Sequence, residues 1–122
     1  MNSLRRAVPL PDSDRYLRIT TNSQARYEDV MGETYLEGAA RLARGSVKRV
    51  RAILYVGLLH EPGITLEKAG DLIDDLGLME AIRLAADAMK AANPELIKDN
   101  AGNASEAAGT DGTTLSASGK RG

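Results

Sequence analysis

The sequence has no cysteine, tryptophan or phenylalanine, and its 122 residues include only four tyrosines and one histidine. Without cysteine, the chain has no disulfide framework and no thiolate metal site. With so few aromatic rings, a core has to be built from aliphatic side chains, which favours packed helices over a β-sandwich. The composition therefore predicts a mainly α-helical protein.

The chain also lacks an excess of charge of either sign. Sixteen Lys and Arg residues face seventeen Asp and Glu residues, for a formal net charge of -1. Such a balance gives no long-range attraction to nucleic acid or to an anionic membrane. The apolar run at residues 52–59 is too short to span a bilayer, and the N-terminus has no apolar signal segment. We therefore expect a soluble cytoplasmic protein that binds neither nucleic acid nor membrane.

The chain divides into three regions, residues 1–22, 23–97 and 98–122. In the first region, turn-forming residues separate two short apolar stretches, and Leu17 and Ile19 alternate with polar neighbours; this predicts a short β-hairpin. Helix caps and glycine stops in the second region predict a compact bundle of about five short helices. The third region has one sizeable apolar side chain, Leu115, and is expected to be a disordered tail. The fold class is thus mainly α (α+β).

Local signals place the ends of the five helices. The first helix is expected to have two turns, with candidate caps Thr21, Asn22 and Ser23 and a stop at Gly32, and the second helix is expected to stop at Gly45. The third helix is expected between Ser46 and Glu61, and the fourth between Thr65 and Gly77. The fifth helix is expected to end at Asn93 and Pro94. Apolar residues at spacings of three and four predict the buried faces. These are Leu36, Ala39, Ala40 and Ala43; Val47, Val50, Ile53, Leu54 and Leu58; Leu66, Ala69, Leu72, Ile73 and Leu76; and Met79, Ile82, Ala85, Ala86 and Met89.

No constellation typical of catalysis is found, so we expect no catalytic, cofactor-binding or metal-binding residues. His60 has no second histidine or cysteine to complete a metal site, and we interpret it as a residue at a helix C-terminus interacting with the helix dipole. Aspartates 71, 74 and 75 lack the irregular glycine-containing loop of a calcium site and are interpreted as a solvated helix face. No nucleophile elbow or acid–base triad is present.

Two features keep a nucleic-acid reading open as an alternative. The basic group is formed by Arg44, Lys48, Arg49 and Arg51; without interleaved aromatic residues we interpret it as a solvated outer face. Two short helices joined at a glycine also fit a small helix-turn-helix regulator. Its second helix has Arg83 and Lys90, but Glu80 and Asp87 accompany them, and it lacks the residues that read base edges.

Several short motifs, taken in order, resemble the phage tail assembly chaperones of the gene-transfer-agent type. The likeness covers residues 2–92. The matching pieces are a basic N-terminal motif and hairpin; Glu28 and Gly32 of a Glu-x-x-x-Gly helix end; Arg51, Ile53, Leu54, Gly57 and Leu58 of the next helix; Thr65 as a cap; and residues 69–74 of an A-G-x-L-I-D helix. Arg6 departs from the small or acidic residues of the family.

The resemblance implies a non-enzymatic role in building long non-contractile tails. Such chaperones bind the tape-measure protein, keep it soluble and recruit tail-tube protein. They act in the host cytoplasm and are not in the mature virion. Assembly along a long client also favours self-association into a homo-oligomer. A structural head or tail completion subunit is a further alternative.

An α-helical chaperone covers the apolar stripe of a client helix with an aliphatic groove. The apolar third helix is the candidate for this groove, with flexible methionines such as Met31, Met79 and Met89 able to adapt it. The candidate surface for the client or for self-association consists of Leu54, Tyr55, Val56, Leu58 and Leu59.

Overall fold

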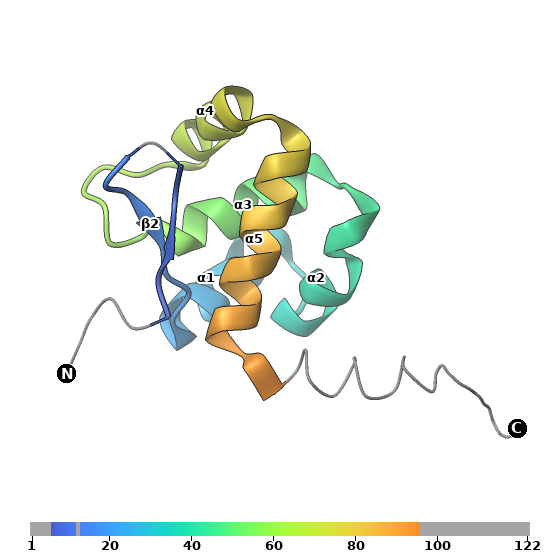
Figure 1. Ribbon diagram of the computed structural model, residues 1–122. Helices are drawn as coiled ribbons and strands as arrows, with labels where there is room; N and C mark the ends of the chain where they lie inside the picture. Colours follow the sequence, from blue (N-terminus) through green and yellow to red (C-terminus); the bar gives the residue numbers. More distant parts are fainter. Residues whose placement is uncertain (1–5, 12, 96–122) are drawn as a thin grey trace, which may run out of the picture. The chain divides into compact units, whose positions relative to one another are not determined.

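The computed structural model describes residues 6–11 and 13–95 (Figure 1). The elements are β1 (Val8–Pro9), β2 (Tyr16–Leu17), α1 (Thr21–Met31), α2 (Tyr35–Arg41), the 3-10 turn η1 (Leu42–Arg44), α3 (Val47–Gly57), α4 (Leu66–Leu76) and α5 (Leu78–Ala92). The prediction of a mainly helical fold behind a short β-hairpin is therefore confirmed. The tail predicted for residues 98–122 lies outside the described residues.

The hairpin is antiparallel, with Val8 opposite Leu17 and Pro9 opposite Tyr16. The predicted alternation in its second arm is confirmed, because Leu17 and Ile19 are buried while the residues between and before them are half-buried. The hairpin and the helices share one hydrophobic core, to which Leu10 also belongs. The hairpin thus forms one wall of the helical core.

Most helix boundaries follow the caps expected from the sequence. The side chains of Ser46 and Thr65 cap α3 and α4, and Gly32 ends α1 with a left-handed backbone. The first helix differs: its cap is Thr20, which exchanges hydrogen bonds with Ser23, and the helix has 11 residues, or three turns. α3 ends at Gly57, before the expected position, because tight turns follow it.

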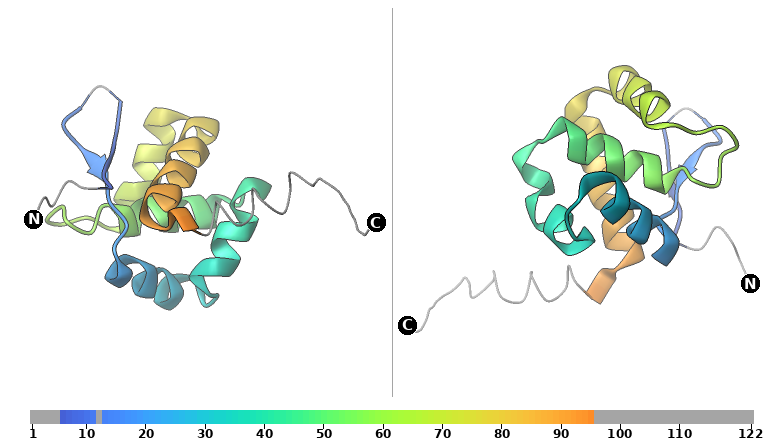
Figure 2. Two further views of the ribbon diagram at one scale, coloured as in Figure 1. Left: turned by 60° about the horizontal axis from the view of Figure 1, so that its bottom comes forward. Right: turned by 180° about the vertical axis from the view of Figure 1, so that it is seen from behind.

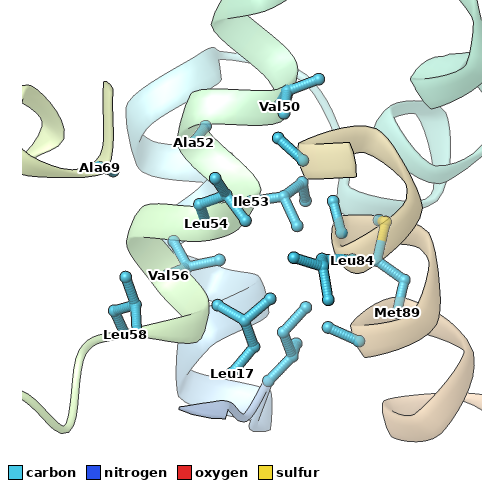
Figure 3. Close-up of a cluster of buried hydrophobic side chains, with 14 of the residues drawn as sticks. Leu17, Val50, Ala52, Ile53, Leu54, Val56, Leu58, Ala69, Leu84 and Met89 are labelled. Atoms are coloured by element: carbon cyan, nitrogen blue, oxygen red, sulfur yellow. The ribbon is translucent and has the colours of Figure 1, made fainter. Parts of the chain in front are cut away.

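α3 is the central helix of the fold. It packs against α1, α4, α5 and β2, so neighbours cover it on most sides (Figures 1 and 2). Ile53 points toward α5, where Leu84 and Met89 lie, whereas Ala52 lies on the side of Ala69 in α4 (Figure 3). The apolar run that begins at residue 52 is therefore explained by burial.

The predicted buried face of α4 is correct at Ala69, Leu72 and Ile73, while Leu66 and Leu76 are half-buried; the predictions for α2, α3 and α5 are partly wrong. In α2 the expected residue Leu36 is 57% exposed, and the buried residues are Tyr35 and Gly38, followed by Leu42 in η1. Val47 and Met79 stand at the beginning of α3 and α5 and are 55% and 77% exposed. In α5 the buried face consists of Ala81, Leu84, Ala85, Ala88, Met89 and Ala92.

A polar cluster, which we call the Tyr27 network, joins α1, the α1–α2 loop and α3. The Tyr27 hydroxyl donates to Glu33 Oε2 at 2.5 Å, and Arg49 donates to both Glu33 oxygens at 2.9 and 3.0 Å. Arg49 and the Tyr27 hydroxyl hold the pKa of Glu33 at about 2, against an ordinary value of 4.5. Arg49 is therefore not part of a solvated face, as the sequence had suggested, but pairs with a largely buried carboxylate.

Gly38 fits beneath the same tyrosine. A Cβ atom at this position would lie 2.6 Å from Cζ and 2.8 Å from Cε2 of the Tyr27 ring. Tyr35 packs edge-on against that ring, at 6.0 Å between ring centroids. These contacts turn α2 so that Tyr35 and Gly38 face inward, which explains why the periodicity of its alanines misplaced its buried face.

Candidate functional site

The surface predicted on α3 is wrong for three of its five residues. Leu54, Val56 and Leu58 have exposed fractions of 0% because they lie at the centre of the core, where α3 meets its neighbours (Figure 3). Tyr55 and Leu59 are half-buried and pack against the core. The Tyr55 hydroxyl accepts a hydrogen bond from Arg26 of α1 at 3.1 Å. The five residues therefore do not form a shared apolar surface in the folded chain.

His60 lies beyond the end of α3 and stacks on Tyr16 of β2. The ring centroids are 4.2 Å apart and the planes differ by 5°. Partial burial lowers the pKa of His60, opposed by the carboxylate of Glu61. The expected interaction with a helix C-terminus is thus replaced by a contact with the hairpin. Within residues 6–11 and 13–95, no group of three or more potential ligands is placed to hold a metal ion.

An ion pair, which we call the hairpin clamp, fastens the hairpin to the α3–α4 loop. Arg15 donates to the two carboxylate oxygens of Glu61 at 3.0 and 2.9 Å. This pairing lowers the pKa of Glu61 and raises that of Arg15. The backbone N–H of Arg18 also donates to the carbonyl of Gly57 at 2.9 Å. The two ends of β2 are thereby tied to the last residue of α3 and to the loop that follows it.

A groove of about 500 Å³ lies between the hairpin, α4 and the first turn of α5, and we call it the hairpin groove. Buried Leu10 and Leu72 and half-buried Leu76 supply its apolar surface. Its lining consists of Leu10, Pro11, Ser13, Arg15, Leu72, Asp75, Leu76 and Glu80. An aliphatic floor with charged groups at the rim suits the apolar stripe of an amphipathic helix.

The charges around the hairpin groove are unequal on its two sides. On the hairpin side, the Arg15 charge is offset by Glu61 in the hairpin clamp. On the helical side lie two carboxylates, Asp75 in α4 and Glu80 in α5, and Glu80 pairs with Arg83. Asp75 makes no salt bridge with another described residue. The α4 edge of the groove is therefore acidic.

Sequence periodicity identified Leu72 and Leu76 as the apolar side of α4, and the exposed aspartates are on a solvated face as expected. It did not identify the groove, because the opposite wall is contributed by Leu10, Pro11 and Arg15 of the hairpin. No short-range pattern reports that residues so far apart in the chain face each other. The clearest signal was the regular apolar spacing in α4 beside a run of acids.

The helix-turn-helix alternative finds little support in the charges of α5. Arg83 is engaged within its own helix by Glu80 and Asp87, and Lys90 is its other cation. The preceding helix presents carboxylates, which repel a phosphate backbone. A second helix with neutralised arginine and acidic neighbours is a poor element for entering a DNA groove.

The motifs that carry the family resemblance are occupied in packing. The Glu28 carboxylate accepts from the backbone N–H of Tyr35, and its carbonyl accepts from Gly32, so Glu-x-x-x-Gly ends α1 and starts α2. A Cβ at Gly57 would lie 3.1 Å from Leu17, and one at Gly70 would lie 3.4 Å from the Arg51 side chain. These motifs therefore describe a scaffold and not a reactive site.

Comparison with known proteins finds no significant match to a family model, a curated protein or a solved structure. Membership of the tail assembly chaperones therefore stays a prediction from the order of motifs. Among the described residues, no helix is both long and apolar enough to cross a membrane.

Proposed function

We propose that this chain is a non-enzymatic tail assembly chaperone of the gene-transfer-agent type. In this role it binds and solubilises the tape-measure protein and recruits tail-tube protein while a long non-contractile tail is built. It acts in the host cytoplasm and leaves before the virion matures. The ordered motifs of residues 2–92 support the family, and a small helical scaffold without a catalytic constellation among its described residues suits the role.

The observation that carries the proposal is the hairpin groove. A tape-measure chain is a long helical polymer whose exposed apolar stripes aggregate unless they are covered. The floor of the hairpin groove is formed by Leu10 and Leu72, which are 4% and 8% exposed, and by half-buried Leu76. Its volume of about 500 Å³ is in the range of binding clefts. The client site therefore moves from α3 to the junction of the hairpin, α4 and α5.

Co-expression with the tape-measure protein tests this function. The Leu76→Gln variant removes apolar surface from the hairpin groove without changing charge, and Leu76 is half-buried at the end of α4. We expect it to fold, by circular dichroism, but to leave the tape-measure protein in the insoluble fraction. The matched control is Leu36→Gln, an exposed leucine of α2 that does not line the groove.

Three outcomes contradict the proposal. The first is a tape-measure protein that the wild-type chain does not keep soluble. The second is a DNA shift in a gel at low salt, where a true DNA-binding protein shows non-specific binding readily. The third is the presence of the chain in purified particles, as a structural head or tail subunit requires.

A further inference from the structure

The acidic edge of the hairpin groove follows its apolar floor along α4. Leu72 and Leu76 are one helical turn apart, and so are Asp71 and Asp75 in the adjacent row. Both aspartates are exposed, as is Asp74. None of the three makes a salt bridge with another described residue. α4 therefore presents carboxylates without salt bridges beside a row of leucines, with Asp75 in the groove lining and Asp71 one turn before it.

The opposite side of the groove balances this charge only in part. Arg15 is the single cation among the lining residues; it pairs with Glu61 in the hairpin clamp and is also attracted by Asp75. Lys68, the one cation of α4, stands in the first turn near Gly63 of the preceding loop and does not line the groove. An acidic helix in the groove would place carboxylates against Asp71 and Asp75, whereas lysines or arginines would pair with them.

We propose that the hairpin groove selects basic amphipathic helices. Resting on the proposed function, this means that the chaperone binds those segments of its client in which an aliphatic stripe is flanked by Lys or Arg. The aliphatic side chains contact Leu10, Leu72 and Leu76, and the flanking cations pair with Asp71 and Asp75. The apolar floor provides affinity. The acidic row determines which helices bind and in which orientation they lie.

Two labelled peptides of about 18 residues test this selectivity. Both carry the same leucine stripe at spacings of three and four, and the flanking positions are lysine in one and glutamate in the other. Binding to the full chain is measured by fluorescence anisotropy at low and at high salt. We expect the lysine peptide to bind about three- to tenfold more tightly, the range given by two or three exposed ion pairs, and the difference to shrink with salt.

Two variants locate the selectivity. The double variant Asp71→Asn, Asp75→Asn should bind both peptides alike, whereas Asp29→Asn, which neutralises an exposed aspartate of α1, should keep the wild-type preference. Equal binding of both peptides by the wild-type chain, tighter binding of the glutamate peptide or no binding of either overturns the inference. It is also overturned if the chain self-associates through the groove, seen as sedimentation of an oligomer that Leu76→Gln abolishes.

The peptides contain no tape-measure sequence, so this test is separate from the co-expression test. A lysine preference together with an insoluble tape-measure protein would overturn the proposed function and leave the selectivity of the groove intact. A soluble tape-measure complex without any lysine preference would support the proposed function and overturn the selectivity of the groove.

Discussion

Two arginine–glutamate pairs hold opposite parts of this molecule, and they share one geometry in different surroundings. In the Tyr27 network, Arg49 grips both oxygens of Glu33, and these side chains are 17% and 13% exposed. In the hairpin clamp, Arg15 grips both oxygens of Glu61, and the exposed fractions are 40% and 24%. Solvent screens the second pair more strongly, so it contributes less to stability.

The difference in burial matches a difference in what each pair supports. The Tyr27 network sits over Gly38, where an aromatic ring lies against a helix backbone with no spare space. The hairpin clamp supports two strands of two residues each and the groove beside them. The α1–α2 side is therefore the more tightly packed of the two, and the side that carries the candidate binding groove is held by the more exposed ion pair.

The largest expected effect comes from Gly38→Ala. The added methyl group overlaps the Tyr27 ring, which its bond to Glu33 holds in place. Overpacking of this kind costs about 1–3 kcal/mol, more than the gain of up to about 1 kcal/mol from replacing a helical glycine. Urea unfolding followed by circular dichroism measures the loss. An unchanged or higher stability would mean that Tyr27 moves aside freely. The α1–α2 side would then not be the more tightly packed of the two.

The second largest effect is expected from acid, which should weaken the Tyr27 network. Because the pKa of Glu33 is lower in the folded chain than in the unfolded chain, its contribution is complete above pH 4.5 and is lost as the pH falls toward 2. The wild-type free energy of unfolding should therefore fall across this window. Glu33→Gln should be less stable at pH 6 and show a shallower fall, measured by urea titrations at pH 6, 4 and 3. Parallel curves for the two proteins would exclude Glu33 as a source of the acid sensitivity.

Glu61→Gln should have a smaller effect than Glu33→Gln. It weakens the hairpin clamp, whose partners are more exposed, so the melting temperature should fall by less. The local consequence is faster hydrogen exchange at the backbone N–H of Arg18, which bonds to Gly57 across the same junction. If the two glutamine variants lose the same stability, burial does not separate the two pairs.

The smallest effect is expected for Gly57→Ala. The new methyl group would lie 3.1 Å from Cδ2 and 3.4 Å from Cβ of Leu17, so this side chain has to shift by only a few tenths of an ångström. The gain in helix propensity offsets this crowding, so the free energy of unfolding should change by less than about 1 kcal/mol. The same urea titration as for Gly38→Ala measures it. A loss as large as that of Gly38→Ala would show that the hairpin side is as tightly packed as the tyrosine side.

The sequence predicted those features that depend on neighbours in the chain. Ser46, Thr65 and Gly77 marked helix ends correctly because a cap acts within one turn of its own helix. The buried face of α2 was misplaced because it depends on the fit of Gly38 beneath Tyr27, a contact between different helices. Local periodicity contains no information about such a contact.

The candidate site shows the same division. The apolar spacing of α4 gave one wall of the hairpin groove, but the other wall comes from the hairpin, and nothing short-range connects the two. Leu54, Val56 and Leu58 appeared available for a partner because the run around them is long. In the folded chain β2, α1, α4 and α5 cover that run, so only Tyr55 and Leu59 keep partial exposure.

The hairpin groove also sets when during its synthesis the protein can act. Leu10 and Glu80 line the same groove although some seventy residues of chain separate them. A hairpin with two-residue strands is not stable alone, and the helices that contact its strands, α3 and α5, follow it in the chain. The groove therefore does not exist in a partly synthesised chain, and any binding that depends on it requires the folded domain.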